Sequence, residues 1–335
     1  MPALTLVILN YNGRSWLAGC LDALLAQRAA PPFETLVVDN GSVDDSVNFV
    51  RTQYPAVRIV ENGRNLGFAG GNNAGVRDAH SEWLVFLNND TVPDPEWLSR
   101  LWEARQAHAE CALIASRLVF MDDPSMVDSA GDGYVRAGGA FKHGHGAPAD
   151  GFAASREVFG ACGAAFMIRR DAFEALGGFD ERFFMVYEDV DLSYRARLRG
   201  LRVWYAADAI VRHAVSGSLG TVSPAFVFYS QRNFEWAWIK NTPRPLLVAT
   251  AVPHALYSAA GVLHYIRLGL GGAALRGKWA AFRALPSVLA DRRRVQATRT
   301  AEVSDLERLM EPRWLAAKRR EKAFASSRRT SNPGS

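Results

Sequence analysis

The chain has 335 residues, 49% of them hydrophobic and 22% charged, which is typical of a globular protein with enough apolar surface for a large core. It has only three cysteines and no CxxC pair, which argues against a disulfide framework or a zinc site. The net charge of +5 is uneven, because residues 276–335 carry 15 basic and 6 acidic residues, a net of +9, and the remainder carries −4. Such a basic segment can meet an anionic membrane surface or nucleic acid.

Strand-like and helix-like patterns alternate through the first 115 residues. Short runs rich in Leu, Val and Ile predict strands over residues 4–9, 33–38, 57–60 and 83–87. Helices are predicted over residues 15–27, 47–54 and 71–79. This alternation builds βαβ units around a parallel sheet, and ligands of such sheets bind beyond the carboxyl ends of the strands.

The middle of the chain is less regular. Residues 121–157 are rich in glycine and lack periodicity, so they are predicted to form a long loop that could include a hairpin. Beyond it, the pattern predicts a buried strand over residues 158–168, a helix over 188–199, and short strands over 201–206 and 209–213.

Two prolines within residues 241–245 predict a boundary, because proline breaks a helix. The next 18 residues, 246–263, carry no formal charge and approach the length of a spanning helix, but Pro253 interrupts them. We therefore expect a helical hairpin or a helix lying in the membrane interface, with a soluble helical subdomain as the alternative. The predicted division is a catalytic domain over residues 1–240, a helical, membrane-associated region over 241–290, and a basic tail over 291–335 whose end is disordered.

Three polar residues, Asn88, Asn89 and Asp90, directly follow the fourth predicted strand. One carboxylate together with diphosphate oxygens is enough to hold Mg²⁺ or Mn²⁺, which prefer oxygen ligands. An Asx-rich turn before Pro93 would produce the same residues without a ligand.

A glycine-rich segment covers residues 65–75. It lacks the Lys-Ser/Thr pair of a Walker loop and the spacing of a dinucleotide fingerprint. Its glycines allow close backbone approach and a helix N-terminus directed at an anion. A plain glycine-rich turn is the alternative.

Three acids, Glu188, Asp189 and Asp191, begin a predicted helix after a mostly aromatic and apolar run. The helix dipole favours acids there, which needs no function. Apolar surroundings also raise the pKa of a carboxyl group, which suits a general base. Glu188 and Asp191 share a helix face and Asp189 points elsewhere, so their roles can differ. His213 follows a predicted strand, and a lone histidine is more often structural than a ligand.

Together and in this order, these segments resemble the inverting glycosyltransferases of family 2, which have the GT-A fold. The segments are VILNYN (residues 7–12), VDNGS (38–42), NLGFAGGNNAG (65–75), FLNND (86–90), GFDERFF (178–184) and YEDVDL (187–192). The resemblance covers residues 3–240 and is greatest to the bacterial rhamnosyltransferase-like branch, of which Arg232-Asn233 and Lys240-Asn241 are also typical. It implies an α/β fold with a mostly parallel, Rossmann-like sheet and flanking helices.

The resemblance also implies roles for the matching residues. Asp189 would be the general base, with Glu188 beside it, and Asp90 would bind the metal, with His213 nearby. Asn88 stands where the family motif has its first Asp, which lowers the negative charge of the site. Asp39 would bind the nucleotide base. The remaining residues expected to bind the nucleotide sugar are Asn10, Asn65, Gly70, Asn73, Asn88, Asn89 and Asp191.

A divalent metal, Mg²⁺ or Mn²⁺, is accordingly the expected cofactor. The implied reaction moves a sugar, rhamnose among the candidates, from a dTDP- or UDP-sugar to a hydroxyl of a saccharide or lipid-linked saccharide in cell-envelope polysaccharide synthesis. A single displacement inverts the anomeric carbon. Because acceptors of this branch are often lipid-linked, we expect a cytoplasmic enzyme, peripheral on the inner face of the cell membrane, with basic residues on anionic lipid.

Two other functions remain as alternatives. A nucleotidyltransferase would need a glycine-rich N-terminal loop with a lysine, which residues 10–14 do not supply. A non-catalytic sugar-nucleotide or membrane-binding scaffold would not need both Asp90 and Asp189. Nucleic-acid binding is not expected, because the basic tail has few aromatic residues and no recognised module.

Overall fold

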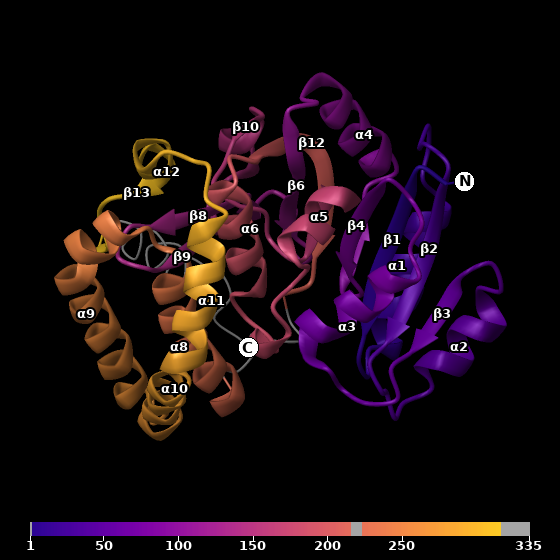
Figure 1. The fold of residues 1–335 in the computed structure, drawn as a ribbon. Helices are drawn as coiled ribbons and strands as arrows, with labels where there is room; N and C mark the ends of the chain where they lie inside the picture. Colours follow the sequence, from indigo (N-terminus) through magenta and orange to yellow (C-terminus); the bar gives the residue numbers. More distant parts are fainter. Residues whose placement is uncertain (1, 216–222, 316–335) are drawn as a thin grey trace.

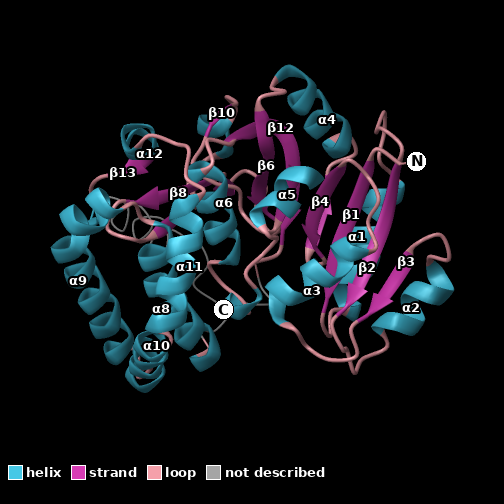
Figure 2. Ribbon diagram, viewed as in Figure 1, coloured by secondary structure: helices cyan, strands magenta, loops and turns pink. Residues whose placement is uncertain are grey.

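The computed structural model describes residues 2–215 and 223–315. Within them, a ten-stranded sheet carries helices on both faces, and a small sheet and a group of C-terminal helices lie beside it (Figures 1 and 2). One half of the large sheet is parallel, in the order β3-β2-β1-β4. Its strands are β1 (Leu4–Asn10), β2 (Phe33–Asp39), β3 (Arg58–Glu61) and β4 (Trp83–Asn88). These four strands agree with the sequence prediction to within a residue or two.

The helices of this half cover both faces of the sheet because successive side chains of each strand point in opposite directions. Leu6 and Ile8 of β1 pack in the core that α1, α2 and α4 cover, whereas Val7 packs in the core that α3, α5 and α6 cover. The helices are α1 (Arg14–Leu25), α2 (Ser46–Gln53), α3 (Gly67–Arg77), α4 (Trp97–Ala107), α5 (Arg170–Leu176) and α6 (Glu188–Leu198). The predicted start of α3 at residue 71 was four residues too late.

The other half of the sheet is mixed. Strand β11 (Ala165–Arg169) runs antiparallel to both β4 and β6 (Cys111–Phe120), and β12 (Arg202–His213) runs parallel to β6. Short strands β5 (Thr91–Pro93), β7 (Val127–Ala130) and β10 (Arg156–Glu157) pair at its margins. The two short strands predicted over residues 201–213 are therefore one strand with a register shift between Ala206 and Ile210.

The segment predicted as a long loop over residues 121–157 contains short strands, including the hairpin that the prediction allowed for. This segment contains β7, β10 and the antiparallel pair β8 (Asp132–Val135) and β9 (Ala140–Lys142), to which β13 (Met310–Glu311) adds a third strand. The strands are only two to four residues long, too short to give a visible period of two in the sequence. The strand predicted over residues 158–168 is also shorter, because β11 begins at Ala165.

The C-terminal helices gather at the end of the molecule opposite β2 and β3 (Figure 1). They are α8 (Pro224–Asn241), α9 (Arg244–Arg267), α10 (Gly271–Arg283), α11 (Leu285–Ala297) and α12 (Val303–Leu309). Helix α9 continues through Pro253, and a turn at residues 268–270 joins it to α10 as a helical hairpin. The predicted tail begins inside α11, and its predicted disordered end lies in residues 316–335, outside the described part of the chain.

Candidate active site

The carboxyl ends of β1, β2 and β4 meet at one edge of the sheet, as their parallel pairing requires. Asn10 ends β1 and donates from Nδ2 to Asp39 Oδ1 at 3.3 Å and to Ser42 Oγ at 3.1 Å. Asn89 in turn donates from Nδ2 to Asn10 Oδ1 at 2.7 Å. The other oxygen of Asp39 accepts backbone N–H bonds from residues 41 and 42. Three predicted site residues are thus held together by direct hydrogen bonds.

The glycine-rich segment is tied to this edge through Asn40. Its Nδ2 donates to Asn65 Oδ1 at 3.0 Å, and Asn65 Oδ1 also accepts the N–H of Gly67 at 2.8 Å. The glycines that follow lie inside α3. A Cβ added at Gly71 would lie 2.4 Å from Leu9, and one at Gly75 would lie 2.5 Å from Val38. These glycines therefore let α3 pack closely on the sheet.

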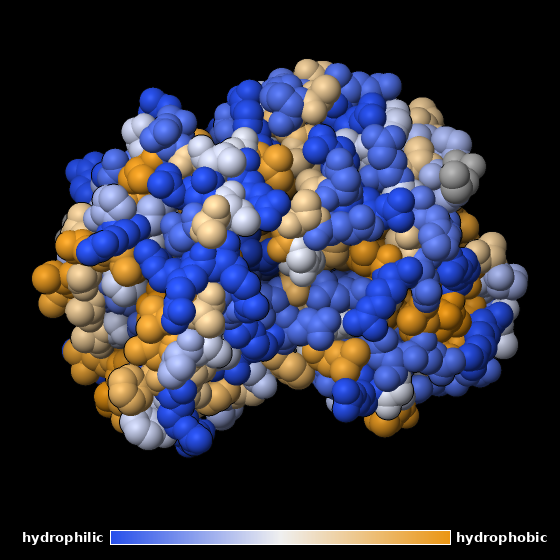
Figure 3. Space-filling view, in the orientation of Figure 1, coloured by the Kyte–Doolittle hydropathy of each residue, from blue (hydrophilic) through white to orange (hydrophobic). Residues whose placement is uncertain are grey.

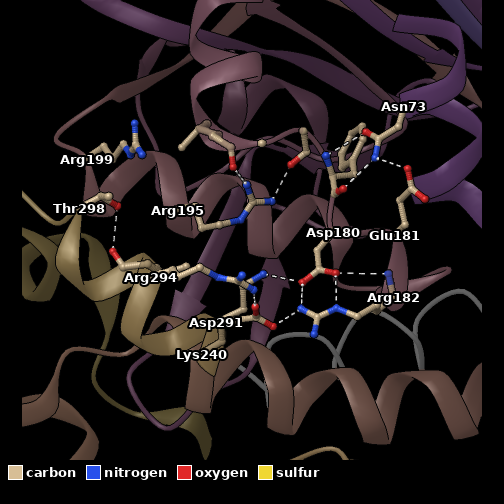
Figure 4. A pocket seen from close by; sticks show the side chains of 15 residues that line it. Asn73, Asp180, Glu181, Arg182, Arg195, Arg199, Lys240, Asp291, Arg294 and Thr298 are labelled. Carbon is tan, nitrogen blue, oxygen red and sulfur yellow. Dashed lines mark hydrogen bonds and ion pairs between the residues drawn. The ribbon is translucent and has the colours of Figure 1, made fainter. Parts of the chain in front are cut away.

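Two residues of α3 that were predicted to bind the nucleotide sugar do not contact the group around Asn10. Gly70 is buried within the helix, where an added Cβ would lie 3.0 Å from Leu66. Asn73 donates to the carbonyl of Phe179 at 2.8 Å and to Glu181 at 3.1 Å. Asn73 lines a pocket with these residues, which Figure 4 shows from close by. The structure thus separates Asn73 from the group around Asn10.

Asp90 and His213 lie side by side although 123 positions separate them. Antiparallel pairing of β5 with β12 places His213 opposite Thr91, and His213 Nε2 lies 3.5 Å from Asp90 Oδ1. The strand-end residue Asn88 precedes them, and its carbonyl accepts the hydroxyl of Thr91 at 2.6 Å. A carboxylate and an imidazole nitrogen in this arrangement fit a divalent metal whose remaining ligands are water and phosphate oxygens.

Behind His213 lies Asp128, a residue that the sequence analysis missed. Its fully buried carboxylate bonds His213 Nδ1 at 2.8 Å and Lys142 Nζ at 2.9 Å from each oxygen. Burial alone would raise the pKa of Asp128, but Lys142, His145 and His213 outweigh it and hold that pKa well below its usual range. Burial likewise opposes protonation of His213, but the two carboxylates beside it raise its pKa. Asp128 therefore fixes the ring of His213 with Nε2 facing Asp90.

Asp189 begins α6 and is half-buried. Its Oδ2 accepts the N–H of Gly163 at 2.8 Å, and its Oδ1 accepts the N–H of Val190 at 2.8 Å. Burial raises its pKa even so. Asp132 and Cys162 lie beside it, with ligand atoms of all three within 4.8 Å of one another. Burial, and then the charge of Asp189, raise the pKa of Asp132 to about 8.

The neighbouring acids differ from Asp189. Glu188 is buried, and its Oε2 has no hydrogen-bond partner among the described residues. Burial, followed by the charge of Asp189, raises the pKa of Glu188 well above its usual range. Asp189 is thus the most accessible of the three acids that start the helix.

Asp191 is fully buried in an ion network. Its carboxylate bonds Arg195 at 2.7 Å, Lys240 at 2.9 Å and Asn241 at 2.8 Å. Lys240 also bonds Asp180 at 2.8 Å, and Figure 4 shows Asp180 among the charged side chains of the pocket. The network connects α6 to the end of α8. A structural anchor of this kind explains Lys240-Asn241 in the sequence.

The loop before Asp189 has an unusual backbone. Phe184, Val186 and Tyr187 have φ of 64°, 66° and 76°, a region that such bulky side chains rarely adopt. Asn233 of α8 lies under this loop and donates from Nδ2 to the carbonyls of residues 183, 185 and 186 at 2.9, 2.9 and 2.7 Å. Strained backbone of this kind concentrates at functional sites and persists only where surrounding contacts enforce it. The sequence signal was Arg232-Asn233, which the resemblance marked without indicating what it does.

The family description "Glycosyl transferase family 2" matches residues 5–177. The chain belongs to this family. It is 31% identical over 230 residues to the O-antigen biosynthesis protein RfbC of Myxococcus xanthus, a match that covers 65% of this chain and 18% of RfbC. It is 28% identical over 247 residues to the N-acetylglucosaminyl-diphospho-decaprenol L-rhamnosyltransferase of Mycobacterium tuberculosis H37Rv, covering 64% of this chain and 80% of that protein. The predicted resemblance to the rhamnosyltransferase-like branch is confirmed.

Solved structures agree on the fold. The mannosyltransferase PcManGT from Pyrobaculum calidifontis, in complex with GDP-Man and Mn²⁺, superposes with a TM-score of 0.52 at 18% identity, over 89% of this chain and 86% of that one. Residues 1–349 of Staphylococcus aureus TarS, in complex with UDP, superpose with a TM-score of 0.51 at 16% identity, over 75% of this chain and 71% of that one. The predicted GT-A fold is therefore confirmed for this glycosyltransferase.

Proposed function

We propose that this family 2 enzyme transfers a sugar, with rhamnose the first candidate, from a dTDP- or UDP-sugar to a hydroxyl of a lipid-linked saccharide, with inversion of the anomeric carbon, in cell-envelope polysaccharide synthesis. The observation that carries the proposal is the half-buried Asp189, whose raised pKa suits a general base, in the first turn of α6 directly after a loop held in a strained conformation. The names of the two relatives, an O-antigen biosynthesis protein and a rhamnosyltransferase, support the substrate class.

The donor would lie along the sheet edge. Asp39 is held by Asn10 and by two backbone N–H groups, and it would accept hydrogen bonds from the nucleotide base. Asn65, Asn88 and Asn89 would line the ribose and the diphosphate. Amides can donate to phosphate oxygens without adding the negative charge that a carboxylate would bring.

Asp90 and His213 would hold a divalent metal, Mg²⁺ or Mn²⁺. When bound, such an ion neutralises charge on the leaving diphosphate. Asp128 keeps the His213 ring oriented, and Lys142 beside Asp128 balances the buried negative charge. The presence of Mn²⁺ in the PcManGT complex supports a metal in this fold.

Asp189 would accept the proton of the acceptor hydroxyl. As that oxygen forms its bond to the anomeric carbon, the bond from this carbon to the diphosphate oxygen breaks on the opposite face, and the nucleoside diphosphate leaves with the electron pair. One displacement inverts the configuration. The buried Glu188 has no comparable access and would instead shape the site next to Asp189.

The acceptor would reach the enzyme at a membrane. Of the described helices, only α9 is long and apolar enough to cross one. One face of α9 packs on α8, where His254 stacks on Trp238 with ring centroids 3.6 Å apart. Its other side exposes apolar residues, as do Trp279 and Phe282 of α10, and orange side chains gather over these helices in Figure 3. The first half of α9 packs on the protein through Leu246, Thr250 and His254, so we favour attachment within the interface over spanning. The enzyme would lie on the cytoplasmic face.

We assign one role to each of the three predicted regions. Residues 1–240 would bind the donor and carry out transfer, residues 241–290 would bind the membrane, and the basic residues after 290 would add attraction to anionic lipid. Because α8 packs against α10 and α11, the membrane-binding helices would be rigidly connected to the catalytic loop.

The test is a screen of purified protein against dTDP-, UDP- and GDP-sugars with Mn²⁺ or Mg²⁺, measuring release of nucleoside diphosphate in the presence of a lipid-linked saccharide. We expect release with one or two donors that depends on both acceptor and metal, and an inverted anomeric signal in the NMR spectrum of the product. A non-catalytic scaffold would bind nucleotide sugar without turnover, and a nucleotidyltransferase would release inorganic diphosphate from a nucleoside triphosphate.

A further inference from the structure

A cavity of about 850 Å³ lies between α8, α9 and the residues after β13, away from the predicted donor residues. Its walls include the aromatic rings of Phe226 and Phe234 from α8, Tyr257 from α9, and Trp314. The rings of Tyr257 and Trp314 stack with centroids 4.9 Å apart. The volume falls within the range of about 300–1,000 Å³ that small-molecule sites occupy. We call this cavity the aromatic pocket.

One end of the aromatic pocket adjoins the catalytic loop. Val186 and Tyr187, two of the residues with positive φ, line the pocket, and Asp189 follows two positions later. The ring of Tyr187 also meets that of Phe234 edge-on, with centroids 6.4 Å apart. A molecule in the pocket would therefore touch the segment that carries the general base.

The other end of the pocket opens toward the exposed side of α9. Leu263 and Arg267 line it there, and Leu263 is 47% exposed. Val248, Val252 and Leu256 extend this apolar surface along the helix at a spacing of four residues, each 61–70% exposed. The pocket thus connects the catalytic loop with the surface proposed to face the membrane.

The polar side chains of the pocket wall, besides its tyrosine hydroxyls, are Ser230, Gln231, Ser258, His264, Arg267 and Lys278. Lys278 of α10 bonds Glu235, and its Nζ lies 4.6 Å from the centre of the Phe234 ring, which in turn meets Tyr187. Gln231 is 92% buried, and its Oε1 has no hydrogen-bond partner among the described residues. Lys278 could therefore bind an anionic group near the catalytic loop.

We propose that the aromatic pocket binds the first part of the hydrocarbon chain of a lipid-linked acceptor, with the adjoining phosphates near Lys278 beside Phe234, so that its sugar lies toward Asp189 and the rest of the chain leaves past Leu263. The inference rests on the proposed function and adds to it a binding site for the acceptor lipid. Apolar surface, a lysine near the catalytic loop and contact with both the membrane side and that loop fit a hydrocarbon chain joined to a diphosphate.

The site can be located without sugar transfer, by photo-crosslinking the full-length protein with a benzophenone analogue of farnesyl diphosphate. We expect label in peptides from α8 and α9, displaced by farnesyl diphosphate but not by inorganic diphosphate. Short-chain dihexanoyl phosphatidylglycerol and a maltooligosaccharide should each compete at least about tenfold more weakly. Equal competition by the phospholipid would make the pocket a general lipid site, equal competition by the saccharide would make it a sugar site, and label elsewhere would also overturn the proposal.

Gly261→Leu is the variant designed to fill the aromatic pocket and so reduce photo-labelling. A Cβ at Gly261 would meet only the Gln231 amide within 4 Å, at 3.6 Å, so a leucine would extend into the pocket. Replacing a helical glycine removes its unfavourable helix propensity, so the fold should be retained. Labelling should fall by about tenfold or more. The exposed Gly272→Leu on α10 is the control and should label like wild type.

Two outcomes separate this inference from the proposed function. Normal transfer to a lipid-linked acceptor by Gly261→Leu would refute the pocket and leave the glycosyltransferase activity standing. Label in the aromatic pocket of a protein that transfers no sugar from any donor would support the lipid site and refute the proposed function. If Gly261→Leu unfolds, Tyr257→Ala removes a wall of the pocket, and wild-type labelling of that variant would overturn the proposal.

Discussion

Replacing Asn233 with alanine should disable the enzyme without unfolding it. The side chain is fully buried, and its Nδ2 group contacts the carbonyl oxygens of Phe183, Met185 and Val186 at 2.9, 2.9 and 2.7 Å. No other described side-chain amide makes three such contacts to this loop. The variant would remove them together and leave the path of α8 unchanged.

The magnitude follows from two opposing contributions. The Nδ2 group of Asn233 has two N–H bonds to donate to the three carbonyls, so the alanine substitution removes about two hydrogen bonds, which stabilise the loop by roughly 1–3 kcal/mol in total. Phe184, Val186 and Tyr187 each hold a positive φ, which costs on the order of 1–3 kcal/mol per residue. Without Asn233 the loop should relax. A shift of about 2 kcal/mol in its equilibrium corresponds to roughly a 30-fold loss of the productive conformation.

The assay combines kcat/KM from nucleoside diphosphate release, the temperature of thermal unfolding, and hydrogen exchange of residues 183–190. We expect kcat/KM to fall about 30-fold or more, exchange in the loop to accelerate, and global unfolding to change little. Asn48→Ala, which removes an exposed bond to Asp45 on α2, should leave all three unchanged. Wild-type kcat/KM and unchanged exchange in Asn233→Ala would refute the role assigned to this residue.

Three further predictions concern the base, the metal site and the membrane. Asp189→Asn should retain donor binding but lose about 10²- to 10⁴-fold in kcat, and turnover of this variant within threefold of wild type would point to another base. In the wild-type enzyme, kcat should fall as the pH drops through the raised pKa of Asp189. Asp128→Asn should weaken Mn²⁺ binding about 10- to 100-fold by calorimetry with nucleoside diphosphate, and an unchanged affinity would contradict the bond to His213 as an orienting contact. Replacing the exposed Trp279 and Phe282 with serine should release the enzyme from anionic vesicles at a salt concentration that wild type withstands, and equal retention would exclude this face.

The parallel half of the fold could be predicted because each strand there is an apolar run that ends in polar residues. A hairpin was allowed for in residues 121–157, but the bounds of the β8–β9 pair could not be predicted, because its strands of three and four residues are stabilised by partners far along the chain, including β13. Pro253 was expected to interrupt its helix, yet α9 continues, since His254 and Thr250 are packed against α8 on the same face. Tertiary contacts outweighed the local preference in both cases.

The candidate site divides in the same way. Asn10, Asp39 and Asn89 could be grouped from sequence, because parallel strands bring their carboxyl ends together. The approach of His213 to Asp90 depends on the pairing of β5 with β12, which no local pattern specifies. Asp128 lies in a segment whose strands were not predicted, so its role became visible only with the fold.

One segment of helix α8 contacts both the loop before Asp189 and the aromatic pocket. Asn233 holds the loop that leads to Asp189, and Gln231, two positions before it, and Phe234, directly after it, line the aromatic pocket. The same segment of α8 therefore contributes both to the proposed acceptor pocket and to the conformation of the loop before the base. Engineering a new acceptor preference should alter α9, whose Tyr257 and Gly261 face the pocket from the other side, and should keep α8 unaltered.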